Sequence, residues 1–270
     1  MTSSPPKIIF IVPYRAREQQ RAFFARHMPY IMEDFAPGYY QIHYVHQLDQ
    51  REFNRGAMKN IGFLAMRDKY PADYKNITFV FNDVDCCPFT KNFLNYETTQ
   101  GVVKHFYGFT YTLGGIFSIT GDDFERVGGF PNFFGYGYED NMIQQRVTRA
   151  GIPIDRSVFY PLYDPNILSF RDGLIRHVNR TDYDLYMAKT DEGLHSFRAL
   201  KYRFEDDFIQ VDSFDCGRTE NRATRSDYDL RDGNAIFGRR GLKPAAGSAA
   251  QPPLMMGSRA RAGASMRMKL

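Results

Sequence analysis

The sequence contains no tryptophan and only three cysteines among 270 residues. Cys86 and Cys87 are adjacent and Cys216 is distant, which is not the spacing of a disulfide framework. No apolar run approaches the roughly 20 residues that span a membrane, and the early run 8–12 is too short for the core of a signal peptide. These absences predict a cytoplasmic protein with no transmembrane segment.

Residues 238–270 contain no aspartate or glutamate and are rich in Gly, Ala, Ser and Pro. They carry seven basic side chains, and subtracting these from the net charge of +4 leaves about −3 for residues 1–237. The segment lacks the interleaved aromatic residues of nucleic-acid-binding chains and the regular amphipathicity of membrane-surface helices. We therefore predict one domain at 1–237, a disordered basic tail at 238–270, and no nucleic-acid partner.

Short apolar runs alternate with segments of helical periodicity in the first part of the chain. The predicted elements are strands at 8–12, 42–45 and 77–81 and helices at 16–34, 54–69 and 139–150, with Asn54 as an N-cap. Strands that alternate with helices predict an α/β domain with a mainly parallel central sheet. Beyond residue 100, closely spaced glycines predict a loop-rich half.

Asp83 and Asp85 directly follow the predicted strand 77–81. Residues two apart in an extended chain point to the same side, so both carboxylates would face one pocket. Ligands bind at the carboxyl ends of strands in open α/β sheets, and two hard oxygen ligands suit Mn²⁺ or Mg²⁺ on a diphosphate. A lone D-x-D is weak evidence by itself, because short acidic turns are common.

The segment after the first strand contains Tyr14, Arg15 and Arg17. Two guanidinium groups and a phenol ring could hold the phosphates and the base of a nucleotide. Taken alone, an ordinary solvated loop explains this segment better.

Glu139 and Asp140 follow a Gly-Tyr-Gly-Tyr segment. Paired carboxylates beside aromatic rings are typical of sugar chemistry, where one acid serves as a general base. Acids at the start of a helix also interact favourably with its dipole, so the structural explanation stays open here. His177 is a further candidate, although a single histidine is more often structural than a ligand.

Taken together, these motifs resemble the β-1,4-galactosyltransferase family, glycosyltransferase family 7, over about residues 8–184. The motifs that carry the resemblance are 12–17 (VPYRAR), 53–63 (FNRGAMKNIGF), 79–85 (FVFNDVD), 114–115 (GG), 128–132 (GGFPN), 135–140 (GYGYED) and 175–177 (IRH). Each motif is modest, but seven of them in this order are highly specific. The resemblance implies a GT-A fold and inverting transfer of Gal or GalNAc from UDP-Gal or UDP-GalNAc to the hydroxyl of a glycan or glycoconjugate.

The resemblance also implies roles for individual residues. Asp85 and His177 would ligate Mn²⁺ or Mg²⁺, and Tyr136, where the family usually has Trp, would close over donor and acceptor on a flexible loop. Glu139 and Asp140 would be the catalytic residues, Glu139 holding an acceptor hydroxyl and Asp140 acting as its general base. The residues implied for donor and nucleotide binding are Pro13, Tyr14, Arg15, Arg17, Phe53, Arg55, Asp83, Val84, Thr112 and Gly115.

Besides Tyr136, four positions depart from the family pattern. Leu174 stands where vertebrate members place a methionine ligand, which predicts weaker metal binding and a looser choice between Mn²⁺ and Mg²⁺. Thr112 replaces a bulky Tyr of galactose-specific members and leaves room for an N-acetyl group. Thr78 replaces a disulfide-forming Cys, which favours a cytoplasmic enzyme of microbial or viral origin. Tyr138 is larger than the family's small residue, so the acceptor is not predicted.

Two alternatives to a family 7 transferase stay open. A polysaccharide- or chondroitin-synthase-type GT-A transferase shares the D-x-D motif and a Gly-aromatic-Gly loop with acids. A catalytically inactive sugar-binding module could keep the pocket without turnover. The presence of both Asp140 and His177 argues against that module, because binding alone requires neither.

Overall fold

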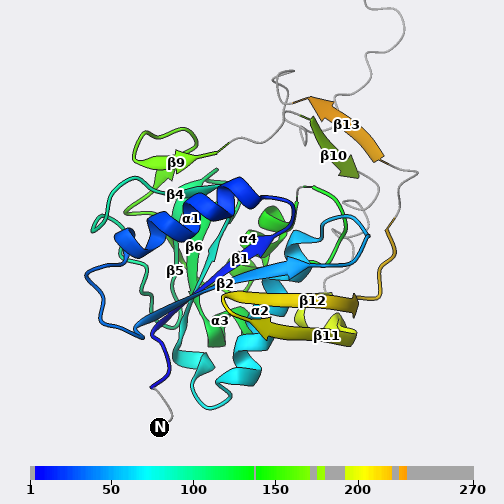
Figure 1. Cartoon of the computed structure of the whole chain (residues 1–270), viewed down its shortest axis with the longest axis horizontal. Helices are drawn as coiled ribbons and strands as arrows, with labels where there is room; N and C mark the ends of the chain where they lie inside the picture. The colour runs from blue at the N-terminus through cyan, green and yellow to red at the C-terminus, as the bar shows by residue number, and fades with distance from the viewer. Residues whose placement is uncertain (1–3, 137, 171–174, 180–191, 221–224, 230–270) are drawn as a thin grey trace, which may run out of the picture. The chain divides into compact units, whose positions relative to one another are not determined.

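β1 (Ile8–Tyr14) lies at the centre of the fold, because all seven of its residues are buried. The computed structural model describes residues 4–136, 138–170, 175–179, 192–220 and 225–229 (Figure 1). The predicted tail 238–270 lies outside these residues, and the described elements belong to one unit, Met1–Asp232.

The other described strands and helices follow in chain order. They are α1 (Glu18–Ile31), β2 (Tyr40–Gln47), α2 (Arg55–Lys69), β3 (Thr78–Asn82), β4 (Cys86–Pro88), β5 (Val103–Gly108), β6 (Ile116–Thr120), α3 (Gly121–Arg126), α4 (Glu139–Arg149), β7 (Ile154–Asp155), β8 (Tyr160–Pro161), β9 (Ile167–Ser169), β10 (Ile175–Asn179), β11 (Arg198–Glu205), β12 (Phe208–Asp215) and β13 (Arg225–Asp229). The strands predicted at 8–12, 42–45 and 77–81 and the helices predicted at 16–34, 54–69 and 139–150 are thus confirmed, with boundaries shifted by a few residues.

Within the described residues, the main sheet has nine strands in the order β11-β12-β2-β1-β3-β6-β5-β7, with β8 also paired to β5. β1 is parallel to β2 and β3, whereas β6 is antiparallel to β3 and β5. The sheet is therefore mixed, with a parallel centre as the alternating pattern predicts. The carboxyl ends of β1, β2 and β3 share one edge, where Arg15 and Asp83 follow their strands.

Alternate residues of β1 supply the cores on the two faces of the sheet. Ile9 and Ile11 pack with the buried residues of α2, while Ile8, Phe10 and Val12 pack with those of α1. This is the period-2 alternation of a strand that is covered on both faces.

The expectation of a loop-rich half beyond residue 100 was wrong for residues 103–108, which form β5, and for residues 116–126, which form β6 and α3. β6 is only five residues long, but it is completely buried between β3 and β5. A short apolar run has no periodicity of its own, so burial from both sides, rather than a local pattern, makes it a strand.

α2 is held tightly against the sheet and against residues 128–132. A Cβ at Gly62 would lie 2.7 Å from Cγ2 of both Ile11 and Val45, so only glycine permits this approach. The side chain of Asn60 donates to Phe130 O at 2.8 Å and accepts from Phe130 N at 2.8 Å. Asn54 caps the helix by accepting from Ala57 N, as predicted. These contacts fix the start of α2 at the carboxyl edge of the sheet.

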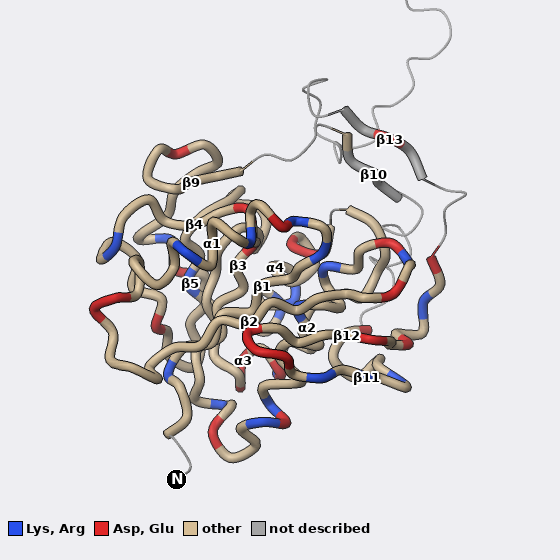
Figure 2. Tube along the Cα trace, viewed as in Figure 1, with Lys and Arg blue, Asp and Glu red and all other residues tan. Residues whose placement is uncertain are grey.

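Charges of both signs are interspersed along the described trace, as Figure 2 shows. This distribution differs from the basic stripe that nucleic-acid-binding domains carry. None of the helices in the described part of the chain combines the length and the apolar character needed to cross a membrane.

Candidate active site

A cavity of about 320 Å³ lies at the carboxyl edge of the sheet, where β1 and β3 end. The residues that line it are Pro13, Arg15, Arg17, Glu52, Phe53, Arg55, Asp83, Val84, Asp85, Gly135, Tyr136 and Ile175. They come from five separate stretches of the chain. The fold therefore gathers residues from five of the seven sequence motifs around one concave site.

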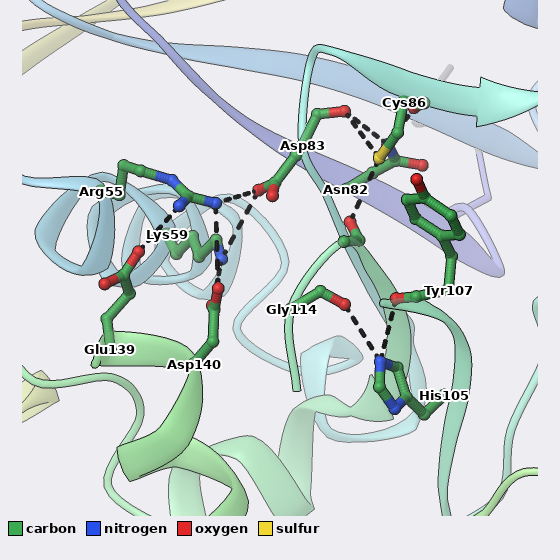
Figure 3. A network of polar contacts seen from close by, with 11 residues as sticks. Arg55, Lys59, Asn82, Asp83, Cys86, His105, Tyr107, Gly114, Glu139 and Asp140 are labelled. Atoms are coloured by element: carbon green, nitrogen blue, oxygen red, sulfur yellow. Dashed lines mark hydrogen bonds and ion pairs between the residues drawn. The ribbon is translucent and has the colours of Figure 1, made fainter. Parts of the chain in front are cut away.

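Arg55, in the first turn of α2, forms one side of a cluster of ion pairs next to this cavity (Figure 3). Its guanidinium lies 2.6 Å from Asp83 Oδ1 and 2.9 Å from Glu139 Oε1, and 4.0 Å from Asp140 Oδ2. The cation-rich start of α2 thus faces the acid-rich start of α4. We call Arg55, Lys59, Asp83, Glu139 and Asp140 the charge cluster.

Lys59 is the second cation of the charge cluster, one turn further along α2. Its Nζ lies 2.9 Å from Asp140 Oδ1 and 3.7 Å from Asp83 Oδ1, and 4.6 Å from the centre of the Phe130 ring. Lys59 is 1% exposed. A charged group in such a place needs partners of opposite charge, and here it has two.

Burial and the two cations act in opposite directions on the carboxyl groups of the charge cluster. Burial alone would raise the pKa of Asp83, but Arg55 and Lys59 outweigh it and hold that pKa below its usual value. Burial raises the pKa of Glu139 in spite of the nearby Arg55 charge. The pKa of Arg55, which burial would lower, is raised well above its usual value by Asp83, Glu139 and Asp140. Asp83 is therefore held ionised, whereas Glu139 binds a proton more readily than usual.

Glu139 is 2% exposed, and neither of its carboxylate oxygens has a hydrogen bond with good geometry among the described residues. Among the described residues, Oε1 makes an ion pair with Arg55 and Oε2 has no partner. Buried polar atoms are normally hydrogen-bonded, so an unpartnered buried oxygen indicates a place for a ligand's donor. Tyr138, directly before it, has a left-handed backbone with φ of +72°, a strain that tends to occur at functional sites.

His105 supports the charge cluster from β5. Its Nε2 lies 3.0 Å from Tyr107 O and 3.1 Å from Gly114 O, while Arg156 Nε donates to Nδ1 at 3.0 Å. Because carbonyl oxygens only accept, the ring proton must be on Nε2. Burial lowers the pKa of His105 to about 4, so the ring stays neutral near pH 7. The neutral ring thus anchors the backbone at Gly114, next to the Asp140 carboxylate.

The structure places three of the expected donor residues away from the cavity wall. Tyr14 is 5% exposed and its ring packs against His46 and Phe208, so it has a packing role here. Thr112 is 8% exposed and its backbone N–H donates to Phe109 O. Gly115 lies behind Asp83, whose N–H donates to the Gly115 carbonyl at 3.0 Å. Their roles toward a donor stay predictions.

The residues expected to bind metal divide between the described and the undescribed parts of the chain. Asp85 lines the cavity, as does Ile175 at the start of β10. His177 follows two residues later in β10, opposite Asp227 of β13, but its side chain lies outside the described part, as do Leu174 and Gly137. Among the described side chains, no three His, Cys, Asp or Glu residues converge on one point.

The donor atoms at this place suit a hard divalent cation. Asp85 contributes carboxylate oxygen at the cavity, whereas the neighbouring Cys86 and Cys87 are buried thiols. Burial raises the pKa of Cys86 well above its usual value and that of Cys87 to about 12, so neither thiol supplies a thiolate near pH 7. Oxygen ligands with little competition from sulfur fit Mn²⁺ or Mg²⁺.

Sequence reasoning assigned no role to Lys59, although it lies within the motif 53–63. The sequence could have indicated a second cation beside Arg55, because Lys59 lies one turn further along a predicted helix whose first turn contains no acid. Glu52, Gly135 and Ile175 also line the cavity without having been predicted. Gly135 and Ile175 lie within two of the motifs and Glu52 directly precedes a third, but only the fold shows that these residues reach the cavity.

Comparisons with solved structures identify the fold. The catalytic domain of Drosophila β1,4-galactosyltransferase 7 in complex with xylobiose matches with a TM-score of 0.59 at 20% identity, over 77% of this chain and 93% of that one. A mutant of the same enzyme, in complex with manganese, UDP-Gal and xylobiose, matches with a TM-score of 0.55 at 19% identity, over the same shares. The fold is therefore that of the GT-A class.

Sequence comparisons define the family within that class. Residues 2–97 match the N-terminal region of glycosyl transferase group 7, and residues 102–163 match the N-terminal domain of galactosyltransferase. Mouse β-1,4-galactosyltransferase 1 is 29% identical over 208 residues, which are 74% of this chain and 49% of that protein. The chain belongs to glycosyltransferase family 7, the β-1,4-galactosyltransferase family. It spans about half the length, or less, of the curated relatives that it matches.

Proposed function

We propose that this chain is an inverting, metal-dependent glycosyltransferase that moves Gal or GalNAc from a UDP-sugar to a carbohydrate hydroxyl. The observation that carries the proposal is the position of the Glu139–Asp140 pair. Both carboxylates are held by α2 cations beside a cavity that is lined by Asp85, Arg15 and Arg17. A sugar bound between the cavity and the Glu139–Asp140 pair would have its diphosphate leaving group on one side and a carboxylate base on the other.

The cavity wall suits a nucleoside diphosphate. Arg15 and Arg17 supply positive charge for phosphate oxygens, and Phe53 offers an apolar surface for a base. Arg15 also donates to the backbone carbonyls of Asp49 and Arg51, which hold its guanidinium in place. UDP-Gal bound to the Drosophila relative supports the same class of donor here.

Asp85 and His177 would hold the cation. When bound, Mn²⁺ or Mg²⁺ would neutralise the negative charge that develops on the departing diphosphate. Manganese in the complex of the Drosophila relative supports this choice of metal.

Asp140 is the proposed base. Its side chain is 18% exposed, so it is accessible to an acceptor, whereas that of its ion-pair partner Lys59 is almost fully buried. The Asp140 carboxylate would take the proton of the acceptor hydroxyl as that oxygen forms a bond to the anomeric carbon. The bond from that carbon to the diphosphate breaks, and its electron pair leaves with UDP. Attack from the side opposite UDP inverts the configuration.

Glu139 would hold the acceptor, and Tyr136 would cover the donor. Oε2 of Glu139, which has no partner among the described residues, can accept a hydrogen bond from a sugar hydroxyl. Tyr136 lines the cavity and can exclude water from it, which limits hydrolysis of the donor. Xylobiose in the complexes of the Drosophila relative supports a carbohydrate acceptor.

Tolerance of UDP-GalNAc is the part of the proposal that rests on Thr112. A threonine leaves more room beside the C2 substituent of the sugar than the Tyr of galactose-specific relatives. UDP-GalNAc should therefore at least be tolerated as a donor, although UDP-Gal remains the family default. Rejection of UDP-GalNAc would restrict the donor to galactose.

The test is a screen of UDP-sugars for release of UDP with Mn²⁺, Mg²⁺ or EDTA, followed by an acceptor array with the preferred donor. We expect metal-dependent release of UDP and a single added sugar with inverted configuration. Repeated addition would favour a polymer synthase. Saturable binding of UDP-sugar without turnover on any acceptor would favour an inactive sugar-binding module.

A further inference from the structure

Lys59 makes the shortest ion pair with the proposed base, yet the mechanism above gives it no task. It occupies the middle of a helix whose residues from Gly56 to Met66 are all buried. Figure 3 shows its side chain extending from α2 between the carboxylates of Asp83 and Asp140. Its Nζ donates to Asp140 Oδ1 at 2.9 Å.

The two oxygens of Asp140 have different surroundings. Oδ1 accepts the hydrogen bond from Lys59, whereas Oδ2 accepts no hydrogen bond from a described residue and lies 4.0 Å from Arg55. Oδ2 also faces Gly114, because a Cβ added there would lie 2.7 Å from it. The Asp140 side chain keeps 18% of its surface exposed. Oδ1 is thus held by Lys59, whereas Oδ2 is available to accept a proton or a hydrogen bond from a ligand.

We propose that Lys59 is a positioning residue that holds Oδ1 of Asp140 and leaves Oδ2 as the oxygen that takes the acceptor's proton. The inference rests on the proposed function, because it assumes that Asp140 is the base. A carboxylate with one anchored oxygen cannot rotate freely, and a proton transfer depends on the distance and direction of the accepting atom.

Lys59 also links the two sides of the site. The same ammonium lies 3.7 Å from Asp83, which borders the cavity, and 2.9 Å from Asp140. Asp83 has a closer partner in Arg55, at 2.6 Å, so it stays anchored without Lys59. Loss of Lys59 should therefore disturb the base far more than the donor side.

The test compares Lys59→Met with Lys69→Met in steady-state kinetics with the preferred UDP-sugar and acceptor. Methionine keeps the length and the apolar stem of the buried side chain but removes its charge and its donor. We expect kcat to fall about 100-fold, with KM for the donor changed less than about threefold. Lys69, an exposed residue in the last turn of the same helix, is the matched control, and its variant should keep wild-type kcat.

A double-mutant cycle separates positioning from a general structural effect. In an Asp140→Asn background, Lys59→Met should change the residual rate by less than about threefold, because the carboxylate it positions is gone. Effects that multiply independently would overturn the inference, as would an unchanged kcat in Lys59→Met.

Lys59→Gln covers the case in which the Met variant fails to fold. The glutamine amide is neutral but still donates a hydrogen bond, so the kcat of Lys59→Gln should lie between those of wild type and Lys59→Met. If Lys59→Met does not fold, the kcat of Lys59→Gln should still lie below that of wild type. A Gln variant as active as wild type would overturn a role for the charge. Wild-type protein without any turnover would overturn the proposed function and this inference together, whereas wild-type turnover with an unaffected Lys59→Met would overturn this inference alone.

Discussion

The cavity wall and the charge cluster share Arg55 and Asp83, but the two regions differ in the surroundings of their charged groups. Asp85, Arg15 and Arg17 line a concave surface at the ends of strands. In the charge cluster, the α2 cations and the buried carboxylates compensate each other within the protein. The wall is thus suited to a ligand's charge, while the cluster is organised before any ligand binds. Groups that are already oriented pay no reorganisation cost during the reaction.

The largest effect that this comparison predicts is that of Asp140→Asn. The amide cannot accept the proton of the acceptor, so kcat should fall about 1000-fold. The measurement is transfer at saturating donor, acceptor and Mn²⁺. Raising the Mn²⁺ concentration should not restore the rate, because the defect lies in the charge cluster. An active Asn variant would refute Asp140 as the base.

Gly114→Ala tests how strongly kcat depends on the position of the Asp140 carboxylate. The added Cβ would lie 2.7 Å from Asp140 Oδ2, so the carboxylate must move while the backbone can stay in place. We expect kcat to fall about 30-fold to 100-fold, since small misplacements of a reacting group are costly. The melting temperature should change little. In an Asp140→Asn background, Gly114→Ala should have almost no further effect on kcat. If it lowers kcat there by the same factor as in wild type, its effect does not come from displacement of the Asp140 carboxylate.

Asp85→Asn tests the cavity wall in the same assay. A neutral amide oxygen is a weaker ligand than a carboxylate, so the Mn²⁺ concentration for half-maximal activity should rise about tenfold. Unlike Asp140→Asn, this variant should recover much of its kcat at high Mn²⁺. An unchanged Mn²⁺ requirement would remove Asp85 from the metal site.

The smallest effect concerns stability, and Glu139→Gln should increase it at neutral pH. Burial raises the pKa of Glu139 above its unfolded value of about 4.3. Such a group stabilises the fold at pH values below its unfolded pKa, and this contribution is lost as pH rises through the folded pKa.

The glutamine variant should therefore melt about 2–4 °C above wild type at pH 7, with the difference shrinking toward pH 4. Thermal unfolding from pH 4 to pH 8 measures this. A variant that melts below wild type at pH 7 would show that the ion pair with Arg55 outweighs the burial of the charge.

Much of the fold could be predicted because its signals are local. The apolar run of β1, the periodicity of α2 and the N-cap Asn54 each depend on a few consecutive residues, and the structure confirms all three. β6 could not be predicted, because its strand conformation depends on pairing with β3 and β5, which are distant in sequence. The orientation of Tyr14 could not be predicted either, since Pro13 and Arg15 line the cavity while the Tyr14 ring packs in the core.

The sequence by itself determined the alternation of strands and helices, the positions of Asp83, Asp85, Glu139 and Asp140 at element ends, and the family. Only the tertiary structure decided that the start of α2 meets the start of α4, which makes Lys59 a partner of Asp140. The physical reason is that a helix buried on all sides offers no solvent for a charge. A lysine there must find its carboxylates elsewhere in the chain, and local sequence does not show where they are.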